Sequence, residues 1–233
     1  MLSTFLQTAV DAVEMTPVQE ELSFSLISMA AKGGWLMLVL LALSIIAIYI
    51  FGKKWWAIRQ AGRIDRNFIK DVDNYLAEGK VRSARALCKR SDTPIARMIE
   101  KGVERIDKPL SDIRIAVENV ANVEVAKLEK GLPALATIAG GAPMIGFLGT
   151  VMGMVQAFFN MAQAGNNIDI TLLSGGIYTA MITTVGGLIV GILAYFGYNF
   201  LTAQVTGLVA KMEASSIEFL DAAQARKESK NQE

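Results

Sequence analysis

The chain has 233 residues, of which 52% are hydrophobic and 19% charged, with a net charge of +1. Soluble domains usually carry about 25% charged residues, and a near-neutral chain gives no reason to expect nucleic acid as a partner. There is no histidine and a single cysteine, Cys88, which excludes an intrachain disulfide, a cysteine metal cluster and a Ser-His-Asp or Cys-His catalytic site. We therefore expect no enzyme, no catalytic residue, no bound metal and no cofactor.

The first segment, residues 1–32, does not look like a signal peptide, because it lacks a basic start and is interrupted by four acidic residues. Its apolar residues recur at helical spacing. They are Leu2, Phe5, Leu6, Ala9, Val10 and Val13. An amphipathic helix on the membrane surface and a weakly ordered terminus both fit this pattern.

Residues 33–52 form an uncharged run that Lys53 and Lys54 close abruptly, with Trp55 and Trp56 directly after them. At 1.5 Å per residue, about 20 helical residues cross a hydrocarbon layer of about 30 Å. Paired tryptophans suit the membrane interface. The run predicts the first transmembrane helix.

Residues 53–130 are predicted to form a helical domain. A stripe of apolar residues precedes Gly79, a helix stop; Thr93 can cap a helix that has Pro94 at its first position; and Ser111 can cap a later helix. The basic residues of this domain could bind a partner's acidic tail or lipid headgroups. Solvated helix faces with i,i+4 ion pairs are the alternative.

Two longer apolar runs follow, and Asp169 is the only charged residue between Lys130 and Lys211. We expect a second transmembrane helix at 131–159, a short turn at 160–170, a third transmembrane helix at 171–201, and a C-terminal helix and tail at 202–233. Both runs exceed the length that a span needs, so their helices should project beyond the bilayer. The fold class is therefore all-α, with three transmembrane helices and a helical domain outside the membrane.

Charge predicts the orientation. Residues 1–32 hold one lysine and four acidic residues, whereas 53–130 hold eighteen Lys or Arg residues and twelve acidic ones. Positive segments stay in the cytoplasm, so the N-terminal segment and the 160–170 turn should be periplasmic. The 53–130 domain and the C-terminus should be cytoplasmic.

The second and third runs are rich in small and hydroxyl residues. Small residues let helix backbones approach closely, and GxxxG spacing is one form of this, while a proline can bend the helix. The candidate packing residues are Gly146, Gly149, Gly153, Gly187, Gly191 and Pro143. The candidate hydroxyl residues are Thr150, Thr179, Thr183 and Thr184. A single Thr can bond its own helix carbonyl, but a set of four could line a polar seam for water or a partner helix.

Two long motifs carry a family resemblance. Residues 135–154 (LATIAGGAPMIGFLGTVMGM) resemble the second-helix signature of the ExbB/TolQ/MotA proton-channel proteins, and residues 176–188 (GIYTAMITTVGGL) resemble the third-helix signature. The segment AYFGYN at 194–199 is similar to the usual ending of that signature. The resemblance extends from about residue 30 to 220 and is nearer to ExbB and TolQ than to the four-span MotA.

The resemblance implies a homo-oligomeric ring of five subunits in the bacterial inner membrane, around ExbD-type single-span helices. Proton flow would drive a TonB-type transducer. Thr150 and Thr184 fall on the family's two pore-facing threonines, and Thr179 stands where many relatives carry Glu. No carboxylate lies in these runs except Asp169, so the proton-binding Asp should come from the partner and pass the two hydroxyls.

Other interpretations stay open. A TolQ-like role in outer-membrane integrity is the alternative to an ExbB-like role, and the transported ion could be sodium. A solute transporter would need polar coordinating groups and usually repeats, and neither is evident. A passive scaffold would use the glycines for packing alone. An intramembrane enzyme would need a nucleophile–base pair, which the runs lack.

Overall fold

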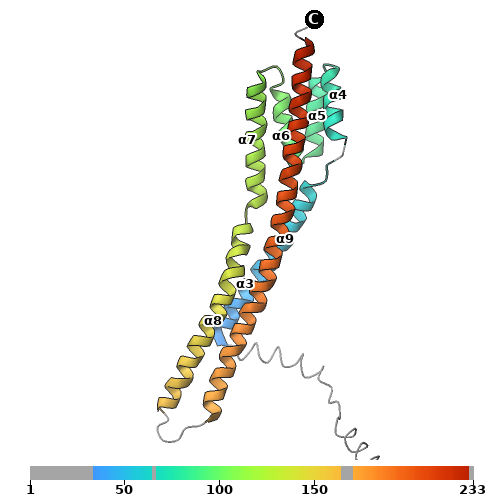
Figure 1. Ribbon diagram of the computed structural model, residues 1–233. Helices are drawn as coiled ribbons and strands as arrows, with labels where there is room; N and C mark the ends of the chain where they lie inside the picture. The colour runs from blue at the N-terminus through green and yellow to red at the C-terminus, as the bar shows by residue number, and fades with distance from the viewer. Residues whose placement is uncertain (1–33, 65–66, 164–169, 231–233) are drawn as a thin grey trace, which may run out of the picture. The chain divides into compact units, whose positions relative to one another are not determined.

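The computed structural model describes residues 34–64, 67–163 and 170–230, which are almost entirely helical and include no strand (Figure 1). The helices are α3 (Gly34–Ala61), α4 (Phe68–Ala77), α5 (Val81–Ser91), α6 (Pro94–Glu104), α7 (Leu110–Glu129), α8 (Leu132–Gln163) and α9 (Ile170–Lys230). The all-α class is confirmed. The predicted segment 1–32 and most of the predicted turn lie outside the described residues.

Three stretches are long and apolar enough to cross a membrane, in α3, in α7–α8 and in α9, as predicted. α8 has 32 residues and α9 has 61, which correspond to about 48 Å and about 90 Å, more than a span requires. α9 continues without a break past residue 202. Large apolar side chains on these helices are exposed, for example Phe147 at 65% and Val155 at 64%, which suits contact with lipid rather than water.

The chain divides into two compact units. The first comprises residues up to Leu43 together with Gly141–Gly191, and the second comprises Ser44–Gly140 together with the residues from Ile192 onward. In the first unit the start of α3 packs on glycines of the other two helices. A Cβ on Gly149 would lie 3.3 Å from Leu36 Cδ1, and one on Gly186 would lie 3.1 Å from Met37 Cε.

In the second unit the short helices pack in chain order, α4 on α5, α5 on α6 and α6 on α7. α6 supplies the centre of the core, because its residues Ile95, Met98, Ile99 and Val103 are all at most 1% exposed. Phe219 of α9 is also buried and lies over Gly102, where a Cβ would come within 2.8 Å of its ring. A glycine in the last turn of α6 therefore makes room for an aromatic ring.

Local signals set most helix ends. The Thr93 hydroxyl accepts a hydrogen bond from Ala96 N (3.3 Å) with Pro94 at the first helical position, as predicted. Gly79 has φ +73°, which a glycine adopts without a Cβ clash, and it follows the end of α4. The predicted cap at Ser111 is wrong. α7 begins at Leu110 with Pro109 before it, because proline stops the preceding chain from being helical.

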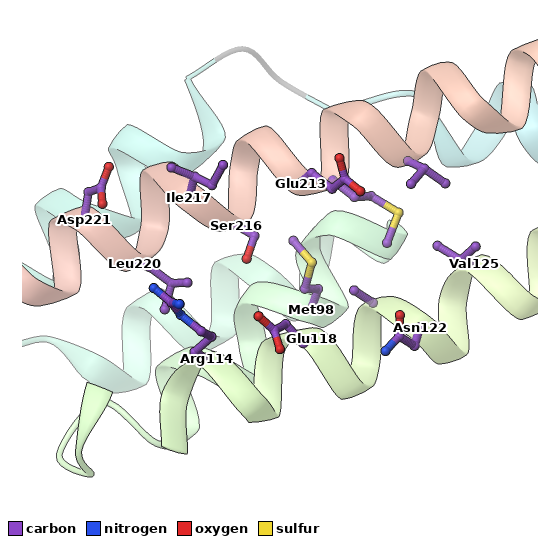
Figure 2. Close-up of a pocket in the computed structure, with 13 residues that line it drawn as sticks. Met98, Arg114, Glu118, Asn122, Val125, Glu213, Ser216, Ile217, Leu220 and Asp221 are labelled. Atoms are coloured by element: carbon purple, nitrogen blue, oxygen red, sulfur yellow. The ribbon is translucent and has the colours of Figure 1, made fainter. Parts of the chain in front are cut away.

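A groove of about 610 Å³ runs between α6, α7 and α9 in the second unit (Figure 2). Its floor is apolar and includes Met98 and Leu220, while Glu118 and Glu213 stand on opposite rims. Arg114 is the one basic residue among those that line it, against three acidic ones. The groove is therefore an acidic feature of this unit.

Candidate functional site

Close packing of small residues brings α8 and α9 together in the first unit. A Cβ on Gly187 would lie 2.6 Å from Ala142 O, and one on Gly146 would lie 2.9 Å from Thr183 O. Further along, a Cβ on Gly153 would lie 2.7 Å from Ala180 Cβ. Real Cβ atoms do not come so close to a neighbouring backbone, so only glycine permits this helix separation.

The short distance between α8 and α9 puts two threonine hydroxyls in direct contact. Thr150 of α8 and Thr184 of α9 hydrogen-bond to each other. Thr150 Oγ1 also lies 3.1 Å from Ala180 O, and Thr184 Oγ1 lies 3.0 Å from Gly146 O, so each side chain also reaches a carbonyl of the opposite helix. We call Thr150 and Thr184 the threonine pair.

The threonine pair has more contacts than protons. Each hydroxyl has one hydrogen to donate, and there are three contacts: one between the hydroxyls and one from each hydroxyl to a carbonyl. At any moment two of them can be true hydrogen bonds. Both side chains are half-buried. Since the two carbonyls also belong to regular helices, a hydroxyl can rotate away without leaving a backbone group unpaired.

The other two candidate threonines differ from the pair and from each other. Thr183 is 2% exposed, its hydroxyl donates to Ala180 O at 2.7 Å, and its side chain packs on Gly149. Thr179 is half-buried, and its hydroxyl donates to Gly175 O, one turn back in its own helix, at 3.0 Å. The structure therefore brings Thr150, Thr183 and Thr184 together and leaves Thr179 apart.

The predicted packing residues are placed as follows. Gly146, Gly149, Gly153 and Gly187 all lie where α8 and α9 approach. Gly191 is buried. Pro143 lies inside α8, which is helical on both sides of it.

A charged network in the second unit was not predicted from the sequence. Arg97 donates from Nη1 to Asp92 Oδ1 and from Nη2 to Glu124 Oε2, and Lys127 Nζ donates to Glu124 Oε1, each at 2.7 Å. Glu124 is only 3% exposed. Burial by itself raises the pKa of its carboxyl, but the hydrogen bonds from Arg97 and Lys127 outweigh burial and hold that pKa below its ordinary value.

One signal could have revealed this network. Ile113, Val117 and Leu128 are buried residues of α7, and Glu124 lies on the same stripe of the helix, four residues before Leu128. An acidic residue at a core position is rarely buried unless it is paired. The sequence therefore reveals the acid's unusual position and its neighbour Lys127, three residues on in the same helix, but not Arg97, which comes from α6.

Cys88 has no features of a reactive cysteine. It is 1% exposed, and burial, reinforced by the nearby Glu100 charge, raises the pKa of its thiol to about 12. A thiol in that state carries almost no thiolate at neutral pH. Among the described residues no three His, Cys, Asp or Glu side chains gather as a metal site.

Comparison with known proteins shows which family this chain belongs to. Residues 90–214, more than half of the chain, match the MotA/TolQ/ExbB proton channel family. The chain belongs to this family. The match covers the threonine pair, the glycine contacts of α8 and α9, and Arg97 with Glu124. With its three apolar helices, this member of the MotA/TolQ/ExbB family is a multi-pass membrane protein.

Individual relatives carry the ExbB name. An ExbB homolog of Methanothermobacter thermautotrophicus is 27% identical over 190 residues, 81% of this chain and 67% of the relative. An ExbB-like protein of Synechocystis is 29% identical over 174 residues, 74% of this chain and 68% of the relative. The biopolymer transport protein ExbB of Neisseria gonorrhoeae is 35% identical over 107 residues, 46% of this chain and 48% of the relative.

Proposed function

We propose that the chain is an ExbB-like subunit of a motor in the bacterial inner membrane, driven by the proton-motive force, that energises TonB-dependent outer-membrane transport. The main observation in support is the threonine pair. Its two hydroxyls lie between apolar helices that approach so closely that only glycine fits at the contact. The family and the biopolymer-transport names of its relatives support the same assignment.

The proposed topology follows from charge. The N-terminal segment and the α8–α9 turn are periplasmic, and residues 53–130 and the C-terminal end of α9 are cytoplasmic, because cationic segments stay on that side. The proposed assembly is a homopentamer around ExbD-type single-span helices, which contact a TonB-type transducer.

The proposed mechanism divides the chemistry between two chains. The uncharged runs of α8 and α9 contain no carboxylate, so a partner Asp carries the proton. An ionised Asp in mid-membrane costs on the order of 3 kcal/mol, and a hydrogen bond to a charged group contributes about 1.5–3 kcal/mol. One or two threonine hydroxyls turned toward the carboxylate therefore offset a cost of the same size.

The structure allows such a turn, because the pair has two protons for three contacts. When a carboxylate arrives, a hydroxyl exchanges a carbonyl for a carboxylate oxygen. When the carboxylate is protonated and leaves, the hydroxyl returns to its carbonyl. Thr150 and Thr184 act here as positioning residues that lower the cost of the charged state, and the proton itself stays on the partner's Asp.

The test is Thr150→Val with Thr184→Val in the complex with its single-span partner. Valine keeps the shape of threonine and removes the hydroxyl, so the complex should assemble while proton uptake into vesicles and motor-driven transport are lost. Thr137→Val is the matched control, because its hydroxyl bonds Pro133 O, one turn back in its own helix, at 2.9 Å. Full proton uptake by the double variant would sink the mechanism.

Two further outcomes separate the alternatives. A passive scaffold predicts no proton uptake from the wild-type complex with or without the partner, whereas the motor predicts uptake only with it. Deletion of the chain separates an ExbB-like from a TolQ-like role. The first predicts poor growth under iron limitation with an intact outer membrane, and the second predicts a leaky outer membrane.

A further inference from the structure

A small cavity of about 210 Å³ lies between α3, α6 and α7 in the second unit. Its apolar walls include Ala57, Ile58 and Leu128, and its polar residues are Lys54, Arg97, Lys127 and Glu124. Three cations and one acid make the lining positive by two charges. The larger groove beside α9 has the opposite sign (Figure 2).

The carboxylate in the cavity is already satisfied. Each oxygen of Glu124 accepts a 2.7 Å hydrogen bond, one from Arg97 and one from Lys127. Lys54 Nζ donates to Lys127 O at 3.0 Å and to Leu128 O at 3.2 Å, which are among the last carbonyls of α7. Carbonyls at a helix C-terminus lack intrahelical partners, and the lysine also offsets the negative end of the helix dipole.

One buried donor in this lining has no partner. Nε of Arg97 is inaccessible to solvent and makes no hydrogen bond with any described residue. A buried unpaired donor costs about 1–3 kcal/mol, and more for a charged group, so an acceptor that reaches this atom is stabilising; the Arg97 side chain as a whole is 37% exposed. Arg97 also belongs to the first turn of α6, where the helix dipole favours an anion.

The charge pattern around the cavity indicates the depth of lipid headgroups. The uncharged run of α3 ends at Gly52, and the next uncharged run begins at Gly131, directly before α8. Lys54 and Leu128 are two and three residues beyond these ends, about 3–5 Å along a helix axis, within the interfacial layer of a bilayer. Trp55 and Trp56 are 45% and 71% exposed in the same turn, as residues at that interface are.

We propose that this cavity binds the phosphate of an anionic phospholipid, with Lys54 and Arg97 as its donors and the acyl chains against the exposed apolar face of α3. A guanidinium edge and an ammonium group are the standard phosphate-binding pair. Lys53 and Lys130 flank the site, and neither forms an ion pair with a described residue, so the surrounding surface also favours an anionic over a zwitterionic lipid.

The test uses the full-length protein in detergent, titrated with phosphatidylglycerol or phosphatidylcholine of equal chain length and read by native mass spectrometry. The wild type should retain phosphatidylglycerol preferentially. Lys54→Gln with Lys127→Gln should weaken that binding roughly 30-fold, the loss expected for two cations near a lipid surface. Lys101→Gln with Lys108→Gln makes the same charge change at exposed positions outside the cavity and should leave the binding unchanged.

A second variant guards against misfolding. Arg97→Lys keeps the positive charge but removes the buried Nε–H, so it should bind phosphatidylglycerol several-fold more weakly while its helical circular dichroism is unchanged. Equal retention of the two lipids by the wild type would overturn the proposal, and so would equal losses in the cavity and control variants. Full displacement of the lipid by millimolar inorganic phosphate would show a free-anion site instead of a lipid site.

Discussion

Replacing Gly187 with alanine tests whether close backbone approach creates the threonine pair. The added Cβ would lie 2.6 Å from Ala142 O, 2.9 Å from Gly146 Cα and 3.1 Å from Gly146 N. All three are backbone atoms, which cannot rotate away as a side chain can. Ordinary contacts between carbon atoms are about 3.5–4.0 Å, so α8 and α9 must separate locally by several tenths of an ångström or more.

Forcing α8 and α9 apart lowers the free energy of unfolding by an amount that can be worked out. Overpacking costs about 1–3 kcal/mol. The hydrogen bonds of Thr150 to Ala180 O at 3.1 Å and of Thr184 to Gly146 O at 3.0 Å would stretch to the limit of a hydrogen bond, and each is worth about 0.6 kcal/mol in a membrane. The better helix propensity of alanine returns up to about 1 kcal/mol. The net loss should be about 1–3 kcal/mol.

Gly175→Ala is the matched control, because it lies in the same helix with no atom within 4 Å of its Cβ position. Unfolding of the purified protein by a denaturing detergent, followed by circular dichroism, should show the Gly187 variant about 1–3 kcal/mol less stable than the wild type and the Gly175 variant unchanged or more stable. If the two variants differ by less than about 0.5 kcal/mol, the packing argument is refuted.

Three further predictions concern the second unit. Burial raises the pKa of Glu124, but hydrogen bonds from Arg97 and Lys127 lower it more, so the stability that ionised Glu124 contributes is present above the ordinary carboxyl pKa and is lost as the pH falls through the lowered pKa. Melting temperatures measured from pH 7 to 3 should show this acid-sensitive component in the wild type and not in Glu124→Gln. Equal pH profiles of the two proteins would contradict the prediction. Cys88 should resist maleimide at pH 7.5 until the protein is denatured, because its thiol is buried with a pKa of about 12; rapid labelling of the folded protein would contradict this. Gly102→Ala should lower the free energy of unfolding by about 1–3 kcal/mol, because the added Cβ would come within 2.8 Å of the Phe219 ring. A second substitution, Phe219→Leu, should recover part of the loss. An unaltered melting temperature in the single variant would argue against this contact.

The membrane helices can be predicted from the sequence alone, because hydrophobicity and length are properties of a single segment. An uncharged run that is closed by Lys53 and Lys54 has few alternatives to a span. Short-range chemistry likewise located the start of α6, since Thr93 and Pro94 act on the turn that follows them. Where two local signals competed, as at Pro109 and Ser111, the rigid proline ring determined where the helix begins.

Which hydroxyls meet depends on how α8 and α9 pack. By residue chemistry alone, without the family resemblance, Thr179 and Thr183 look equivalent to Thr184. A Thr hydroxyl can satisfy itself on its own helix, and Thr179 does so. The choice depends on how far each residue lies from the opposing helix, which the glycine contacts set across more than thirty residues of chain. The same is true of Glu124, whose burial is tolerable because Arg97 arrives from another helix. Pairing between distant segments is a property of the packed helices, and no single segment contains it.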